Sequence, residues 1–318
     1  MKNFSPVTGN DASPHSLSVS SPAEIMNMAR RERTKMLVSH GDSIVIFREN
    51  PLFDYFSEDG RAEGVLITDN GISLIGEKEV DEEFVPLDRS DVCSIPPFYE
   101  FRNARRCSEE INGIFGFMLR YESEVIKSKK MEIYKAITPL LSSITGADSE
   151  ISLANSVMDA TCSKGIQLFY NPIVAFDSNT TKIWNRPGNG TSKKVMYLEI
   201  ASRSNGMTAL FSETFLTSDS EKGEEGYRSI LAGIDAIKRL FVDGGRTSDV
   251  SRELMDYRNE KLYLTTPLFP FSYHMIPGPD EKIRIGDVAV FDLWTNAGEF
   301  RIRKKVTAVA GSYAAEVF

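Results

Sequence analysis

The stretch that decides the fold is KVMYLEIASRSNGMTALFSETF, residues 194–215. Apolar residues recur in broken alternation on both sides of a polar turn at 202–206, which is typical of two β-strands rather than of a helix. The turn contains Asn205-Gly206, the dipeptide that best adopts the positive φ angles of a tight hairpin. The first strand is mostly apolar and must be covered, so we expect the hairpin to lie in the middle of a sheet. Glu199 is then a buried carboxylate that needs a partner, because an unpaired buried charge is costly.

Length and composition limit the class of protein. The chain has 318 residues, of which 41% are hydrophobic and 26% charged, and its formal net charge is −8. These values are typical of a globular protein with one large or two medium domains. The acidic balance argues against binding to nucleic acid or to an anionic membrane. The sequence has no apolar run of the ~18 residues that a membrane span needs and no leader pattern, so we expect a cytoplasmic protein.

The cysteines and the basic runs form no recognisable motif. Cys93, Cys107 and Cys162 are odd in number and lack CxxC spacing, so we expect neither a disulfide framework nor a zinc site. Cys162 falls on the apolar stripe of an expected helix and is interpreted as a core residue. The basic clusters at 102–106 and 301–305 are interpreted as solvated faces, which is what short charge runs usually are.

The chain divides into three stretches. Residues 1–22 are rich in Ser, Pro, Asn and Gly and have no apolar face, so we expect a flexible N-terminal arm. Residues 23–122 combine short helical and strand patterns, as in a small α/β domain. Residues 123–318 pair long amphipathic helices with antiparallel strands, which favours an α+β fold. We expect helices at 103–121, 127–144, 150–164, 221–242 and 248–257, and strands at 43–47, 64–68, 72–75, 167–176, 261–265, 287–293 and 299–309.

Four segments carry a resemblance to a known family. They are NPLFDYFSEDGRAEGVLITDNGISLIG (50–76), VIKSKKMEIYKAI (125–137), ADSEISLANSVMDATCSKGI (147–166) and GEEGYRSILAGIDAIKRLFVDGGRTSDVSREL (223–254). In this order they resemble the creatinase/aminopeptidase family, nearest to Xaa-Pro aminopeptidases and prolidases. The resemblance covers about residues 23–318. It implies a pita-bread C-terminal domain preceded by a small α/β domain.

The resemblance also implies a metal site that has lost its ligands. The family's peptidases hold two divalent metals, such as Mn²⁺ or Co²⁺, with two Asp, one His and two Glu. These positions fall on Glu199, Leu210, Pro267, Asp292 and Arg303. Leucine and proline offer no donor atom, and arginine repels a cation. We therefore expect no bound cofactor, with a divalent metal as the alternative if these ligands are misplaced. The alignment rests on LFSETF (210–215), IRIGDVAVFD (283–292) and EFRIRKKVTAV (299–309).

The family's two substrate histidines have different counterparts here. AFDSNTTKIW (175–184) resembles the family's "asGpNa-x-x-pH", which places Trp184 at one of them. His274 matches the other and is the candidate catalytic residue, because imidazole titrates near neutral pH. Trp184 and Trp294 either fill the space that metals and water leave or stack on a ligand.

The charged side chains that remain in the candidate cleft need partners. We predict that Glu199 pairs with Arg303, whose guanidinium would stand where the cations would have been. Glu213 falls at the position of a motif arginine and is expected to be exposed.

Two classes of function follow from the resemblance. The first is a non-catalytic homologue that binds a peptide, a protein or a small molecule in the cleft. The alternative is an active hydrolase, either a proline-specific metallopeptidase or a metal-free, creatinase-like amidinohydrolase. The resemblance further implies a homodimer, and we expect no nucleic-acid or membrane partner.

Overall fold

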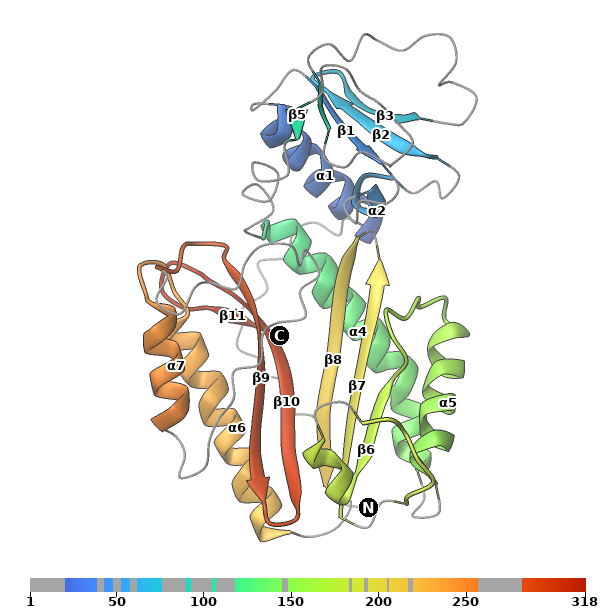
Figure 1. The fold of residues 1–318 in the computed structure, drawn as a ribbon, viewed down its shortest axis with the longest axis vertical. Helices are drawn as coiled ribbons and strands as arrows, with labels where there is room; N and C mark the ends of the chain where they lie inside the picture. The colour runs from blue at the N-terminus through green and yellow to red at the C-terminus, as the bar shows by residue number, and fades with distance from the viewer. Residues whose placement is uncertain are drawn as a thin grey trace.

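The structure, a computed structural model, has a smaller N-terminal part and a larger C-terminal part (Figure 1). It describes residues 21–38, 43–47, 53–57, 62–75, 90–92, 105–106, 118–144, 148–182, 185–191, 194–204, 206–216, 220–256 and 282–318. Helices combine with largely antiparallel sheets, so the predicted α+β class is confirmed. None of the helices in these ranges has both the length and the hydropathy that crossing a membrane requires.

The N-terminal part is a five-stranded sheet, with strand order β3-β2-β1-β4-β5, packed against a helix. Its elements are α1 (Pro22–Val38), β1 (Ser43–Phe47), α2 (Phe53–Phe56), β2 (Gly64–Thr68), β3 (Gly71–Ile75), β4 (Ser90–Val92) and β5 (Arg105–Arg106). The helix expected at 103–121 is wrong at Arg105–Arg106, because these residues pair with β4 as a short parallel strand. Local spacing does not reveal such a tertiary pairing.

Two three-stranded antiparallel sheets lie side by side in the C-terminal part (Figure 1). The first has the order β6-β7-β8 and the second the order β11-β10-β9. Their strands are β6 (Ile173–Phe176), β7 (Val195–Ser204), β8 (Met207–Leu216), β9 (Val288–Ala297), β10 (Phe300–Val309) and β11 (Glu316–Val317).

Side-chain hydroxyls join the two sheets where β8 meets β10, a line that we call the seam. The hydroxyl of Thr214 accepts from the backbone N–H of Arg303 at 2.9 Å and donates to the carbonyl oxygen of Arg303 at 2.6 Å. The hydroxyl of Ser212 accepts from the backbone N–H of Lys305 at 2.9 Å. These bonds satisfy buried backbone groups of β10 that a neighbouring strand would otherwise satisfy.

The hairpin of β7 and β8 forms as predicted, with Ser204 paired to Met207 across a two-residue turn. Gly206 in that turn has φ 69°, in the left-handed region that favours glycine. A Cβ atom there would also lie 2.8 Å from the backbone nitrogen of Tyr55, so glycine lets the turn approach the N-terminal part closely. β7 is the central strand of its sheet, as expected, whereas β8 ends that sheet at the seam.

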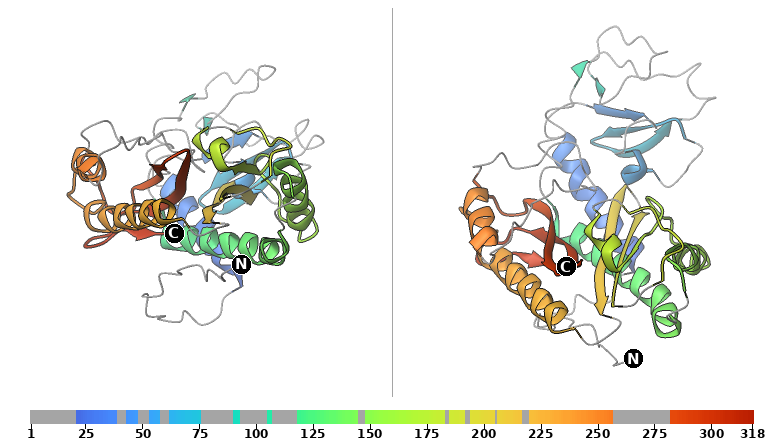
Figure 2. Two further views of the ribbon diagram at one scale, coloured as in Figure 1. Left: turned by 90° about the horizontal axis from the view of Figure 1, so that it is seen from below. Right: turned by 60° about the horizontal axis from the view of Figure 1, so that its bottom comes forward.

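Helices lie on one face of the strands and a short 3-10 helix on the other. The bounds are α4 (Arg120–Ser143), α5 (Glu150–Cys162), η1 (Asp177–Thr181), α6 (Glu221–Leu240) and α7 (Thr247–Asp256). α4 and α6 lie across the strands, with η1 on the opposite side, which we call the η1 face (Figure 2, left). The domain division expected at 122–123 falls in the first turn of α4 and stays a prediction.

The buried stripe of α5 differs from the expected one. Leu153, Val157 and Thr161 are buried, and Cys162 is exposed, so its assignment to the core is wrong. One residue along a helix turns the side chain by about 100°, because 3.6 residues complete a turn. Thr161 can occupy the buried position because its hydroxyl donates to the carbonyl of Val157 at 2.8 Å.

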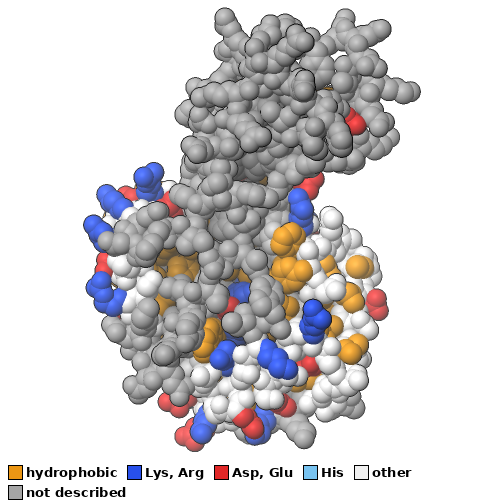
Figure 3. Space-filling model, viewed as in Figure 1, with side chains coloured by type: hydrophobic (Ala, Val, Ile, Leu, Met, Phe, Trp, Pro, Cys, Tyr) orange, Lys and Arg blue, Asp and Glu red, His pale blue; other side chains and the backbone are white. Residues whose placement is uncertain are grey.

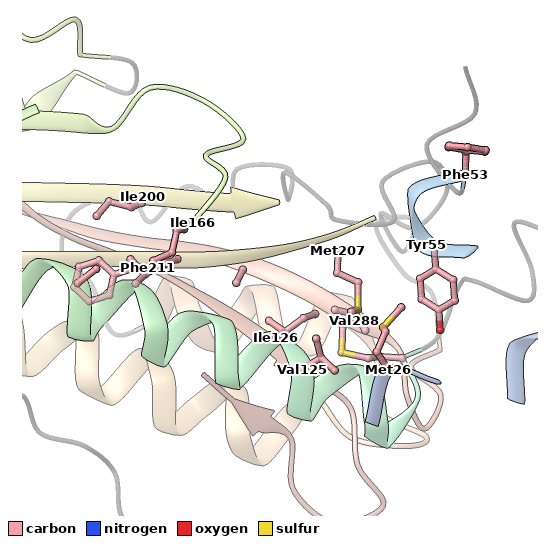
Figure 4. Packing of buried hydrophobic residues seen from close by; sticks show 14 of the residues in the cluster. Met26, Phe53, Tyr55, Val125, Ile126, Ile166, Ile200, Met207, Phe211 and Val288 are labelled. Atoms are coloured by element: carbon pink, nitrogen blue, oxygen red, sulfur yellow. The ribbon is translucent and has the colours of Figure 1, made fainter. Parts of the chain in front are cut away.

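Two main apolar clusters stabilise the fold. One runs from α1 and α2 along α4 to the hairpin, and Figure 4 shows Met26, Tyr55, Ile126, Met207 and Phe211 among its members. The N-terminal part therefore shares its core with the first sheet. The other cluster lies between α6, α7 and the second sheet, with members such as Ile230, Phe241, Leu254, Phe291 and Ile302.

A buried ion pair connects the two parts of the chain. Arg33 of α1 donates from Nε and Nη2 to the two carboxylate oxygens of Glu122 in α4, at 2.8 and 2.7 Å. Tyr55 donates its hydroxyl to the same carboxylate at 2.7 Å, as does the backbone N–H of Leu119. The side chains of Arg33 and Glu122 are fully buried, so each compensates a charge that would otherwise be costly.

Replacing Glu122 by glutamine should therefore destabilise the protein strongly. Glu122→Gln leaves the guanidinium of Arg33 buried without its counter-charge, a loss of about 3–5 kcal/mol. The measurement is the free energy of unfolding in urea. Glu132→Gln is the control, because the side chains of its ion pair with Lys129 are 41% and 29% exposed, so the pair is accessible to solvent and should be worth less than about 1 kcal/mol. Equal losses in the two variants would contradict the assignment.

Candidate functional site

Strand register brings five polar side chains together on the η1 face. The residues of β7 on either side of Glu199 pack into the core beneath α4, so Glu199 points to the opposite face. The hairpin register places Ser212 opposite Glu199. Across the seam, Asp292 of β9 is opposite Lys305 of β10. Arg303, two residues from Lys305, shares that face.

Glu199 is the centre of this group, and its carboxylate is fully buried. Lys305 donates from Nζ to Oε1 at 2.8 Å, and Tyr170 donates its hydroxyl to the same oxygen at 2.5 Å. Tyr197 donates to Oε2 and also contacts the hydroxyl of Ser212 at 3.0 Å. The ion pair of Glu199 and Lys305 thus passes over β8 and connects the two sheets.

A second closed ion pair lies beside the first. Arg303 donates from Nε to Oδ1 of Asp292 at 2.8 Å and from Nη2 to Oδ2. The bidentate geometry is the strongest arrangement that a guanidinium and a carboxylate adopt. Both side chains are buried, and the guanidinium also lies 5.1 Å from the ring centre of Tyr197.

The pKa shifts show which groups are charged. Burial disfavours the ionised carboxylate of Glu199, but the Lys305 ammonium and the hydrogen bonds outweigh it and hold the pKa of Glu199 below its usual value. Burial, reinforced by the charge of Glu199, raises the pKa of Tyr170 and of Tyr197. Both tyrosines therefore remain neutral hydrogen-bond donors. The bonds to Asp292 outweigh burial and raise the pKa of Arg303.

Three predictions about charged residues are wrong. Glu199 pairs with Lys305 rather than with Arg303, because Arg303 is held by Asp292. The basic run 301–305 is not a solvated face, since Arg303 and Lys305 are buried. Glu213 is likewise not exposed: it forms an ion pair with Lys304, and their side chains are only 16% and 18% exposed. Arg303 meets a partner from the neighbouring strand β9, whereas Lys304 and Lys305 meet partners from the first sheet.

The remaining predicted site residues divide into described and undescribed ones. Leu210 pairs with Ala201, two residues from Glu199, and so shares the η1 face. Trp294 is buried there, with the guanidinium of Arg301 at 3.9 Å from its ring centre, so it fills space. Trp184, Pro267 and His274 lie outside the described residues.

Asp177, the first residue of η1, has an unusual backbone conformation. Among the described residues other than glycine it alone has a positive φ, 45°. Few residues other than glycine adopt that conformation. The carboxylate of Asp177 compensates by accepting from the backbone N–H groups of Lys194 and Val195 at 2.8 and 2.9 Å.

The side chains present do not fit a dinuclear metal centre. Two divalent cations require several shared carboxylate oxygens, and here the carboxylates of Glu199 and Asp292 are already bound by a lysine and an arginine. Within the described ranges, no three His, Cys, Asp or Glu side chains are grouped so that they could hold a metal ion. The fixed positive charges of Lys305 and Arg303 would repel the cations.

The architecture defines the class of protein. Two adjoining antiparallel sheets, with helices on one face and the polar site on the other, form the pita-bread fold that the sequence predicted, behind a smaller N-terminal part.

Comparison with solved structures gives the particular proteins that this chain resembles. It is similar to the X-Pro aminopeptidase of Thermotoga maritima MSB8 with a TM-score of 0.73 and 14% identity, over 90% of this chain and 97% of that one. The prolidase of Pyrococcus horikoshii OT3 has a TM-score of 0.65 and 16% identity, over 90% of this chain and 97% of that one. The Xaa-Pro dipeptidase of Bacillus anthracis has a TM-score of 0.67 and 15% identity, over 91% of this chain and 96% of that one. The predicted fold relationship is thereby confirmed. No protein-family model and no curated sequence matches the chain.

Sequence reasoning missed four residues of the site, which are Ser212, Lys305, Tyr197 and Tyr170. Ser212 is two residues from Leu210 and so shares a face with that predicted residue. Lys305 is two residues from Arg303, and Tyr197 is two residues before Glu199, so alternation along a strand signals that each shares a face with a predicted residue. Tyr170 gave no such signal. It lies before β6, and only the folded chain brings its hydroxyl to Glu199.

The lowered pKa of Glu199 predicts how stability depends on pH. Ionised Glu199 stabilises the fold above the carboxyl pKa of the unfolded chain, about 4.3, and this contribution is lost as the pH falls through the lower pKa of the folded state. Glu199→Gln removes that ionisation. The difference in unfolding free energy between the natural protein and Glu199→Gln should therefore be constant near neutral pH and shrink below about pH 4.3. A difference that does not change on acidification would contradict the pair.

Proposed function

We propose that this protein is a non-catalytic homologue of the Xaa-Pro peptidases that binds a peptide on its η1 face. The observation that carries the proposal is the pair of closed ion pairs, Glu199 with Lys305 and Asp292 with Arg303. The resemblance places Glu199, Asp292 and Arg303 at metal-ligand positions of the peptidases. Both carboxylates are occupied by cationic side chains, so neither is available to bind a metal or activate water. The fold and the η1 face remain for recognition.

An exposed aromatic residue beside the site supports binding. Phe169 donates its backbone N–H to the carbonyl of Ala201, which is two residues from Glu199 on β7 and lies on the same face. The side chain of Phe169 is 49% exposed. Its ring centre lies 5.8 Å from that of Tyr170, which bonds to Glu199. Hydrophobic and basic side chains reach the surface together on this face (Figure 3). Such a surface suits a peptide, which presents apolar side chains and a terminal carboxylate.

The alternative is an active hydrolase. A metallopeptidase would need ligands that we have placed elsewhere, and a metal-free, creatinase-like enzyme would use His274 as its base. A homodimer and a cytoplasmic location belong to the same proposal. Light scattering of the purified protein tests the dimer.

Metal and turnover measurements separate the two functions. We expect the purified protein, incubated with Mn²⁺ or Co²⁺, to retain no stoichiometric metal and to gain no thermal stability, because a ligand that binds the native state would raise the unfolding temperature. We also expect no cleavage of an Xaa-Pro dipeptide. Bound metal with turnover would establish the metallopeptidase, and turnover without metal the creatinase-like enzyme.

Binding is tested with a proline dipeptide as the probe. Isothermal titration calorimetry with Ala-Pro should show binding to the natural protein. Phe169→Ala should weaken this binding about tenfold, which is the loss typical of removing an exposed aromatic contact. Tyr313→Ala is the matched control, because Tyr313 is 95% exposed in the turn before β11. Binding that both variants reduce equally, or that neither changes, would exclude the Phe169 surface.

A further inference from the structure

A partly exposed arginine lies on the η1 face, at the end of β7 nearest the N-terminal part (Figure 1). Arg203 is four residues from Glu199 on this strand and so shares its face. Its Nη2 atom lies 2.6 Å from Oδ2 of Asp54 in α2, and the two side chains are 34% and 49% exposed. The guanidinium of Arg303 on the same face is buried against Asp292, whereas that of Arg203 reaches solvent.

Much of the hydrogen-bonding capacity of Arg203 is unused. A guanidinium has five N–H donors, and a single carboxylate takes two of them in the bidentate arrangement, as Asp292 does from Arg303. In the described part of the chain, Asp54 is the one ionic partner of Arg203. The planar fork of an arginine matches the two oxygens of a carboxylate. Arg203 can therefore bind a second carboxylate, which a ligand would supply from the solvent side.

An exposed phenylalanine lies beside Arg203. The backbone N–H of Phe169 donates to the carbonyl of Ala201 at 2.8 Å, and that of Arg203 donates to the carbonyl of Gln167 at 2.9 Å. These two bonds make Phe169 and Arg203 diagonal neighbours on adjacent chain segments, a relation in which residues are about 7–8 Å apart. The ring of Phe169 also lies 5.8 Å from that of Tyr170, so it stays next to the polar site.

We propose that Arg203 binds the terminal carboxylate of the peptide while Phe169 contacts its apolar side chain. This inference rests on the peptide binding proposed above and names the group that recognises the charged end of the peptide. Two extended residues span about 7 Å, so a dipeptide is long enough to reach both side chains. The ligand class is a short peptide with a free carboxyl end, which an internal segment of a longer chain lacks.

Amidation of the ligand tests the charge contact. The full chain is titrated by isothermal titration calorimetry with Ala-Pro and with Ala-Pro amide, which lacks the terminal negative charge. We expect the natural protein to bind Ala-Pro about tenfold more tightly, because the amide loses a charge-assisted hydrogen bond. Arg203→Met should weaken the binding of Ala-Pro about tenfold and leave that of the amide unchanged. A preference for Ala-Pro that survives in Arg203→Met overturns the inference.

The two ends of the ion pair separate recognition from a structural role. Arg203→Met and Asp54→Asn both break the pair, whose partial exposure makes it a minor contributor to stability, so both variants should fold. Asp54→Asn keeps an oxygen that accepts from Arg203 but removes the charge that repels a ligand carboxylate, so Ala-Pro should bind about threefold more tightly. A pair that only joined α2 to the hairpin would give weaker binding in both variants, and that result overturns the inference. Arg228→Met, at an exposed pair with Glu224 on α6, is the control and should change nothing.

The calorimetry also distinguishes this inference from the proposed function. If Ala-Pro and its amide bind the natural protein equally well, peptide binding stands and the role of Arg203 is overturned. If neither ligand binds, the proposed function fails, and the role of Arg203 fails with it.

Discussion

The constraint on which the site depends is that a charge buried in a sheet needs a partner. Lys305 and Asp292 are directly opposite in the register of β9 and β10, yet they do not form the main ion pairs. Arg303 reaches diagonally to Asp292, and Lys305 reaches across β8 to Glu199. Each carboxylate thereby obtains one cation. Lys305 lies on the second sheet and Glu199 on the first. The ion pair that neutralises Glu199 therefore also fixes the two sheets relative to each other.

The fold was predictable because its signals are local and follow one another along the chain. The hairpin of β7 and β8 is marked by strand alternation and by Asn205-Gly206, and its register agrees with that turn. The pita-bread arrangement itself was predicted from the resemblance of four segments, in their order along the chain, to the creatinase/aminopeptidase family. Where a segment pairs only through tertiary contacts, as Arg105–Arg106 does with β4, the sequence pattern predicts a different structure.

The site was predictable in its positions but not in its partners. The resemblance to the family's motifs assigned Glu199, Asp292 and Arg303 to one site. Alternation along a strand tells only which face a residue occupies. It does not tell how far strands are shifted relative to each other, and that shift decides that Arg303 meets Asp292 while Lys305 meets Glu199. The sequence also does not tell whether a charged residue is buried. A basic run is interpreted as solvated unless its acidic partners, which come from other strands, are known.

The hydroxyl-joined seam has a consequence for how the molecule comes apart. The largest apolar cluster joins the N-terminal part, α4 and the hairpin, and a separate one lies under α6, α7 and the second sheet. Between β8 and β10, Ser212 supplies one hydrogen bond and Thr214 two, where a strand ladder would supply a continuous series. A line held by few hydrogen bonds opens more readily than a continuous ladder, so the seam is where we expect the two sheets to separate first.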